Sequence, residues 1–151
     1  MSIVVRYLPV TECLERVSLT GSALQVFQAQ EVVEALAPSH SLQVLTCAHM
    51  QIDTVTLHAL IRFLTVNKSL QKFDLRGIHQ LDKQLFQLLE ALKLNSSLQL
   101  LNLEGNVHIF LELVSSHLLI YNIPFRTIVT NNFILEGERF EHNLSYLGHG
   151  I

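Results

Sequence analysis

Charged residues are scarce in this sequence of 151 residues. They make up 15% of the chain, whereas hydrophobic residues make up 49%. A chain this apolar can bury enough surface to offset the conformational entropy lost on folding, which excludes intrinsic disorder. Ten basic and thirteen acidic residues leave a formal net charge of -3, and no run of lysine or arginine occurs. The absence of a basic cluster argues against a nucleic acid or a membrane surface as the partner.

Cysteine and long apolar runs are scarce as well. The two cysteines, Cys13 and Cys47, cannot build a disulfide framework, and we expect both thiols to be free and reduced. No stretch approaches the roughly 20 apolar residues of a membrane-spanning helix. The first ten residues are too short, and too interrupted by Arg6 and Pro9, to be a secretory signal. We therefore expect one soluble domain in the cytoplasm.

Leucine, in contrast, is abundant, with 29 residues, and it follows a strict period. The tripeptide Ser-Leu-Gln begins at Ser41, Ser69 and Ser97, at intervals of 28 residues, and one more step back reaches Cys13. Such self-similarity is typical of repeat proteins. It divides the chain into four units, residues 13–40, 41–68, 69–96 and 97–124.

The spacing of apolar residues changes within each unit. The first half has apolar residues two apart, as a half-buried strand requires. The second half has helical spacing, most clearly from Leu81 to Leu92, and Asp53 and Asp82 stand near helix starts, where carboxylates cap free N–H groups. A strand followed by a helix, four times over, predicts an α/β solenoid with a parallel sheet. The inward ladders are Leu14, Leu42, Leu70 and Leu98, then Val17, Leu45, Phe73 and Leu101, then Leu19, Cys47, Leu75 and Leu103.

Two stretches carry a family resemblance. Leu64–Leu70 followed by Phe73–Gly77, and Leu92–Leu98 followed by Leu101–Asn106, resemble leucine-rich repeats of the ribonuclease-inhibitor type, with 28-residue repeats. The resemblance covers residues 13–124. It implies a short right-handed β-α superhelix with the parallel sheet on its concave face and the helices on its convex face.

The sequence departs from that family at two asparagine positions. The ladder asparagine, which ties the turn after each strand, occurs only as Asn106, so the resemblance implies irregular turn hydrogen bonding in the other three units. The inter-repeat asparagine occurs as Asn67 and Asn95 and is replaced by Ser39 and Ile123. Atypical outer repeats are expected in a capped solenoid.

The two ends of an open stack of repeats leave strand edges unpaired, and a capping segment must cover these edges to prevent pairing with other chains. We expect residues 1–12 to form an N-terminal cap and residues 125–151 a C-terminal capping strand and tail. Within the latter, residues 125–131 repeat the strand pattern one residue early, and residues 133–140 indicate a hairpin or an extended cover. The predicted helix of residues 109–121 has almost no polar side. Either the C-terminal segment covers it, or a second copy does in a homodimer.

Outward-facing residues of adjacent strands form columns about 4.8 Å apart. On the central strands these columns mix apolar residues with both signs of charge, which suits a modest protein interface. The alternative is a solvated sheet face with internal salt bridges. We expect a non-catalytic protein–protein interaction module with an unidentified protein partner, and with these binding residues: Lys72, Asp74, Arg76, Leu100, Asn102 and Glu104.

Other kinds of site have little support. His49, His79 and His108 follow predicted strands, but they occupy different repeat positions without a carboxylate or thiol at ligand spacing, so we expect no metal site. Cys47 occupies an inward position and is interpreted as a small core residue; Cys13 begins its strand and is interpreted as similarly unactivated. No phosphate loop, nucleophile elbow or paired-carboxylate motif occurs. We expect neither an enzyme nor a cofactor.

Two alternatives stay open. The C-terminus carries Glu136, Glu138 and Glu141, followed by apolar residues up to Ile151, and resembles glutamate-rich export signals of bacterial effectors. In that case the chain acts on host proteins in the host cytosol. The second alternative is a self-assembling structural subunit.

Overall fold

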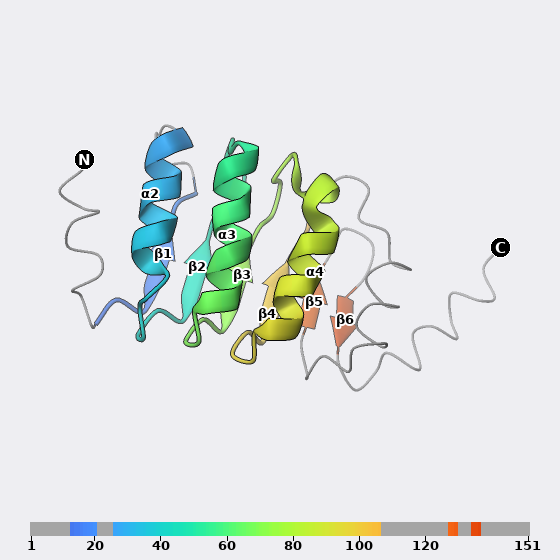
Figure 1. Cartoon of the computed structure of the whole chain (residues 1–151). Coiled ribbons are helices and arrows are strands. Elements are labelled where there is room, and N and C mark those ends of the chain that lie inside the picture. The colour runs from blue at the N-terminus through green and yellow to red at the C-terminus, as the bar shows by residue number, and fades with distance from the viewer. Residues whose placement is uncertain (1–12, 21–25, 107–126, 130–133, 137–151) are drawn as a thin grey trace.

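The computed structural model describes residues 13–20, 26–106, 127–129 and 134–136 (Figure 1). Strands and helices alternate along this part of the chain. In chain order the elements are β1 (Arg16–Ser18), α2 (Val26–Leu36), β2 (Val44–Thr46), α3 (Thr54–Val66), β3 (Lys72–Asp74), the 3-10 turn η2 (Leu81–Gln84), α4 (Leu85–Leu94), β4 (Leu100–Asn102), β5 (Thr127–Val129) and β6 (Ile134–Glu136).

The six strands form one sheet in the order in which they occur in the chain. Strands β1 to β5 pair in parallel, and Leu45 lies opposite Phe73, which lies opposite Leu101. Leu101 in turn lies opposite Ile128, one residue earlier than the 28-residue period, as the sequence predicted for a fifth strand. Strand β6 then pairs antiparallel with β5, which matches the hairpin alternative for this segment.

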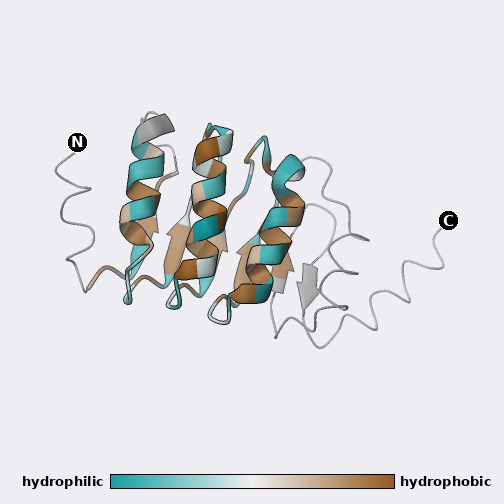
Figure 2. Cartoon of the chain, viewed as in Figure 1, coloured by the Kyte–Doolittle hydropathy of each residue, from teal (hydrophilic) through white to brown (hydrophobic). Residues whose placement is uncertain are grey.

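The helices lie side by side on one face of the sheet (Figure 1). Hydrophobic and hydrophilic residues alternate along α3 and α4 (Figure 2), as expected for helices that bury one side only. Asp53 caps α3, because its Oδ1 accepts a hydrogen bond from Thr56 N at 2.8 Å. That bond lowers the pKa of the Asp53 carboxyl. Asp82 lies within η2, and the residue at the N-cap of α4 is Gln84.

The core lies between the sheet and the helices, and its rows are the predicted ladders. Leu42, Leu70, Leu45, Phe73 and Leu101 are completely buried, and the remaining ladder residues of the second to fourth units are at least 98% buried. In the first unit, Leu14 and Val17 are only partly buried, and within the described residues β1 pairs with β2 alone. The rings of Phe63 in α3 and Phe73 in β3 join the two layers, with their centroids 6.2 Å apart.

Two buried asparagines join successive repeats. Asn67 Nδ2 donates to the carbonyls of Ala37 and Ser39 in the preceding repeat, while its Oδ1 accepts from Leu70 N at 2.8 Å. Asn95 makes the equivalent bonds one repeat later. At the substituted position, Ser39 Oγ accepts from Leu42 N at 3.2 Å. Serine at this position therefore keeps the hydrogen bond from the backbone N–H three residues later, which Asn67 and Asn95 also accept.

The turns after the strands correct one expectation. Asn106 makes the predicted ladder bonds, to Ile78 N and to the Leu75 carbonyl. The other three turns were expected to be irregular, yet in the two of them that the structure describes the backbone pairing continues regularly: His49 N donates to Arg76 O, and Gly77 N donates to Glu104 O. In the second, third and fourth repeats the ninth position adopts a left-handed backbone, with φ of 56° at His49, 62° at Gly77 and 74° at Gly105.

Several predicted features lie outside the described residues. They are the N-terminal cap of residues 1–12, the apolar helix of residues 109–121, and the tail beyond β6. The division of the chain into caps and repeats therefore stays a prediction at both ends.

Candidate functional site

The predicted columns exist on the face of the sheet opposite the helices, which is the concave face of the solenoid. Lys72 lies in register between Val44 and Leu100, and Asp74 lies between Thr46 and Asn102. All six predicted binding residues therefore lie on β3 and β4 or directly after them. We call this set, Lys72, Asp74, Arg76, Leu100, Asn102 and Glu104, the concave cluster.

Asp74 and Arg76 form an ion pair within the concave cluster. Arg76 Nε lies 3.0 Å from each carboxylate oxygen of Asp74, and Arg76 Nη2 lies 2.8 Å from Oδ2. Hydrogen bonding to Asp74, the charge of Asp74 and the charge of Glu104 raise the pKa of Arg76. The Asp74 side chain is 18% exposed and that of Arg76 is 41% exposed. The alternative of an internal salt bridge therefore applies to this pair.

The remaining members present a mixed surface. Lys72 and Glu104 are exposed, while Leu100 and Val44 are partly buried beside Lys72. Within the described residues, no carboxylate lies within 4.0 Å of the Lys72 ammonium. The surface thus offers a partly exposed leucine and an unpaired cation next to a fixed carboxylate–guanidinium pair.

One residue of the outward columns is not exposed. Ala48 lies 28 residues before Arg76 and therefore in the same column, yet it is completely buried. On the central strands this column therefore contributes only Arg76 and Glu104 to the surface.

The histidines and cysteines do not form a reactive site within the described residues. His49 and His79 belong to no group of three potential ligands that could hold a metal ion in that part of the chain, and His108 lies outside it. Cys47 is completely buried, and burial together with the charge of Asp74 raises its pKa to about 12. Cys13 is exposed and precedes β1 instead of beginning it.

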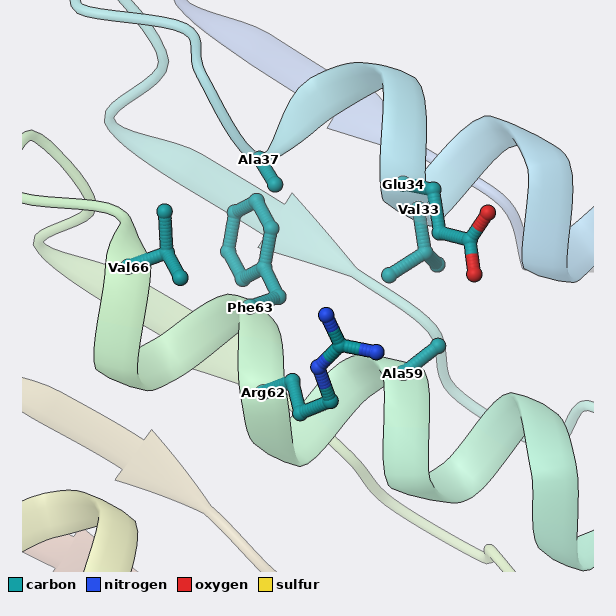
Figure 3. Close-up of a pocket in the computed structure, with 7 residues that line it drawn as sticks. All are labelled: Val33, Glu34, Ala37, Ala59, Arg62, Phe63 and Val66. Atoms are coloured by element: carbon teal, nitrogen blue, oxygen red, sulfur yellow. The ribbon is translucent and has the colours of Figure 1, made fainter.

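Sequence reasoning missed two hollows on the helical, convex face. The first, which we call the α2–α3 groove, has a volume of about 390 Å³ (Figure 3). The second, the α3–α4 hollow, has a volume of about 290 Å³ and includes Phe86 and Leu94. The available signal was apolar residues at outward helix positions: Val66 is 57% exposed, Phe86 55% and Leu94 66%. The groove between α2 and α3 is lined by Val33, Glu34, Ala37, Ala59, Arg62, Phe63 and Val66.

Among the described residues, no helix combines the length and the apolar character needed to cross a membrane.

Comparison with known proteins identifies the fold. The sequence matches no family model, and no curated protein matches it. The solved structures that are similar in three dimensions include two protein domains. One is the leiomodin-1 Actin-Binding Site 2, with a TM-score of 0.75 and 17% identity over 97% of this chain and 88% of that one. The other is the tropomodulin C-terminal domain of Caenorhabditis elegans, with a TM-score of 0.74 and 14% identity over 97% of this chain and 96% of that one. The predicted α/β solenoid of leucine-rich-repeat type is thereby confirmed.

Proposed function

We propose that this leucine-rich-repeat chain is a non-catalytic recognition module that binds a protein partner through the concave cluster. The observation that carries the proposal is the alignment of Val44, Lys72 and Leu100 in one column beside the Asp74–Arg76 pair. None of these side chains is required by the inward packing of the ladders. A partly buried leucine within a charged rim is the composition of a protein interface with a central anchor.

The fixed geometry of Arg76 supports this assignment. A guanidinium already held by Asp74 loses little side-chain entropy when a partner binds, which favours recognition of an acceptor group on that partner. Lys72 supplies an unpaired charge that attracts a partner of opposite sign from a distance. We therefore propose that the partner presents an apolar residue to Leu100 and an acidic group to Lys72.

Actin is the first partner to test. The domain of leiomodin-1 with the same fold is an actin-binding site. Titration of fluorescently labelled monomeric actin with the purified chain measures this directly. A dissociation constant that rises in the concave variants supports actin as the partner, and a flat titration excludes it without excluding the concave cluster.

The test of the surface itself uses matched variants. Partners are captured from an extract of the source cells with the parent chain, with Arg76→Glu and with Leu100→Asp. We expect each variant to weaken capture by about 5- to 150-fold, equivalent to about 1–3 kcal/mol for a central anchor. Lys83→Glu and Val55→Asp introduce comparable charge changes at exposed helical residues outside both surfaces and control for charge. If both concave variants capture the partner as well as the parent does, the concave cluster is not the binding site.

A further inference from the structure

The α2–α3 groove on the convex face has an apolar floor. Val33 of α2 and Phe63 of α3 are each 1% exposed, and Ala59 is 8% exposed. The hollow exists because two of its lining residues, Ala37 and Ala59, have only methyl side chains, which leave the space between the helices unfilled (Figure 3). Val66 stands at its edge and is 57% exposed. A pocket of this volume and composition is large enough for bulky apolar side chains of a ligand.

Two opposite charges face each other across this groove. The Arg62 side chain extends from α3 towards α2, and Glu34 projects from α2 (Figure 3). In the part of the chain described by the structure, no carboxylate lies within 4.0 Å of the Arg62 guanidinium. Glu34 instead accepts a hydrogen bond from Gln30 Nε2 at 3.0 Å. The groove therefore has a cation on one wall and an anion on the other, and the two are not paired with each other.

The apolar surface continues on the other side of Arg62. That residue also lines the α3–α4 hollow, where Phe86 and Leu94 are 55% and 66% exposed. Lys93, in the same hollow, forms an ion pair with Glu90. Arg62 thus lies at the boundary of two apolar hollows and, among the described residues, has no ion-pair partner. Exposed apolar surface of this kind, bordered by polar residues, marks interaction sites.

We propose that the α2–α3 groove is a second docking surface, which binds an amphipathic α-helix of another protein. The occupant presents its apolar side to Val33, Phe63 and Val66, a carboxylate to Arg62 and a basic side chain to Glu34. The proposal goes beyond the concave cluster, which lies on the opposite face of the sheet.

The geometry favours a helix over an extended peptide. The backbone groups of α2 and α3 are used within the helices, so the groove has no unpaired strand edge to which a peptide could add by β-pairing. Two neighbouring parallel helices instead form a channel in which a third helix packs by its side chains. Helix α3 has 13 residues and is therefore about 20 Å long, which matches anchors at positions i, i+3 or i+4, and i+7 of the occupant.

The opposed charges make the proposal testable with designed peptides. The probe is a fluorescent synthetic helix of about 18 residues that carries leucines on one side, glutamates along one edge of that side and lysines along the other. A mirror peptide has the glutamates and lysines exchanged. Fluorescence anisotropy with the full chain measures the affinity for both. We expect the parent chain to distinguish the two peptides by about tenfold, because one of them places like charges against both Arg62 and Glu34.

Variants test each part of the groove. We expect Arg62→Glu to weaken binding of the preferred peptide by about tenfold, and Val66→Asp to weaken it at least as much, because it places a charge at the apolar edge. The double variant Glu34→Lys/Arg62→Glu should reverse the preference and bind the mirror peptide more tightly. Lys83→Glu and the concave variant Leu100→Asp should leave both affinities unchanged.

Three results would overturn the proposal. They are equal affinity of the parent chain for the two peptides, no saturable binding of either, and a double variant that keeps the parent's preference. A concentration-dependent dimer in sedimentation velocity that Val66→Asp abolishes would assign the groove to a second copy of this chain. Loss of peptide binding in Leu100→Asp alone would move the site to the concave cluster.

Discussion

The imidazole of His49 lies over Gly77, in the space that a Cβ atom of that glycine would occupy. Both residues hold the ninth position of their repeats and have a left-handed backbone, with φ of 56° and 62°. In this conformation His49 N and Gly77 N both point towards the next repeat and bond to its carbonyls. Histidine at such a position carries a backbone strain that glycine avoids. The regular turn geometry thus depends on a glycine next to a strained residue.

We predict that Gly77→Ala is more destabilising in the parent chain than in a His49→Gly background. A left-handed backbone costs about 1–2 kcal/mol in a residue other than glycine, and the new Cβ also displaces the His49 ring. Without that ring, only the backbone strain remains, so the cost should fall by about 0.5–1 kcal/mol. Urea unfolding of the four chains in this cycle measures the difference. Equal costs in the two backgrounds would show that the ring and the glycine are not coupled.

We predict that the inter-repeat asparagine Asn95 contributes more to the free energy of unfolding than Ser39, which occupies the same repeat position. Asn95→Ala leaves the buried Leu64 carbonyl and the Leu98 N–H without their side-chain partner, and we expect a loss of about 2–4 kcal/mol in the free energy of unfolding. Ser39→Ala removes only local bonds, those of its Oγ with Leu42 N and Ser41 Oγ, and should cost about 1 kcal/mol. Denaturant midpoints measure both. Equal losses would mean that the bonds between repeats contribute nothing beyond the local bond.

The leucine ladder should be far more sensitive to truncation than the helical surface. Leu101 is completely buried in β4, and we expect Leu101→Ala to cost about 2–5 kcal/mol through lost burial and a cavity. Leu94→Ala makes the same chemical change at a side chain that is 66% exposed and should cost less than about 0.5 kcal/mol. A parent-like denaturant midpoint for Leu101→Ala would contradict the ladder assignment.

The two thiols should differ sharply in reactivity. Cys13 is exposed and Cys47 is buried. With an aromatic disulfide reagent at pH 8, we therefore expect one thiol to react rapidly in the native chain and the second only after unfolding. Rapid reaction of both thiols under native conditions would contradict the burial of Cys47.

The raised pKa of Cys47 also sets a pH dependence of stability. The group has a pKa of about 12 in the folded chain against a reference value of 9.0. Folding therefore favours the neutral thiol. Its contribution to the free energy of unfolding is fully present below about pH 8. This contribution is lost as the pH rises from about 9 towards 12, because the thiol ionises first in the unfolded chain. Cys47→Ala should remove this part of the alkaline decline, as measured by unfolding at a series of pH values.

Much of the fold could be predicted from the sequence because the repeat tests the same pattern several times. Leu42, Leu70 and Leu98 recur at one spacing, and a register shifted by one residue would expose this apolar ladder. The cap at Asp53 followed from the local rule for helix starts. The cap of α4 did not, because a 3-10 turn places Gln84, not Asp82, at the helix start. Such turns depend on packing that a single sequence pattern does not contain.

The candidate site was predictable only in part. The columns followed from the period, since strands in register bring Lys72 beside Leu100. The bidentate bond between Arg76 and Asp74 depends on side-chain rotamers, and the burial of Ala48 does not follow from its position in the repeat. The convex groove depends on how far apart two helices pack.

By itself, the sequence determined the repeat length, the inward ladders and the order of strands, because each of these depends on which residues avoid water at a regular spacing. Only the tertiary structure decided which outward residues are exposed, which charges pair, and where hollows remain. Arg62 shows the difference. The sequence places it on a helix, but its position between two apolar hollows, without a carboxylate partner among the described residues, results from the packing of α2, α3 and α4. Short-range periodicity encodes burial, whereas a binding surface is set by distances between residues far apart in the chain.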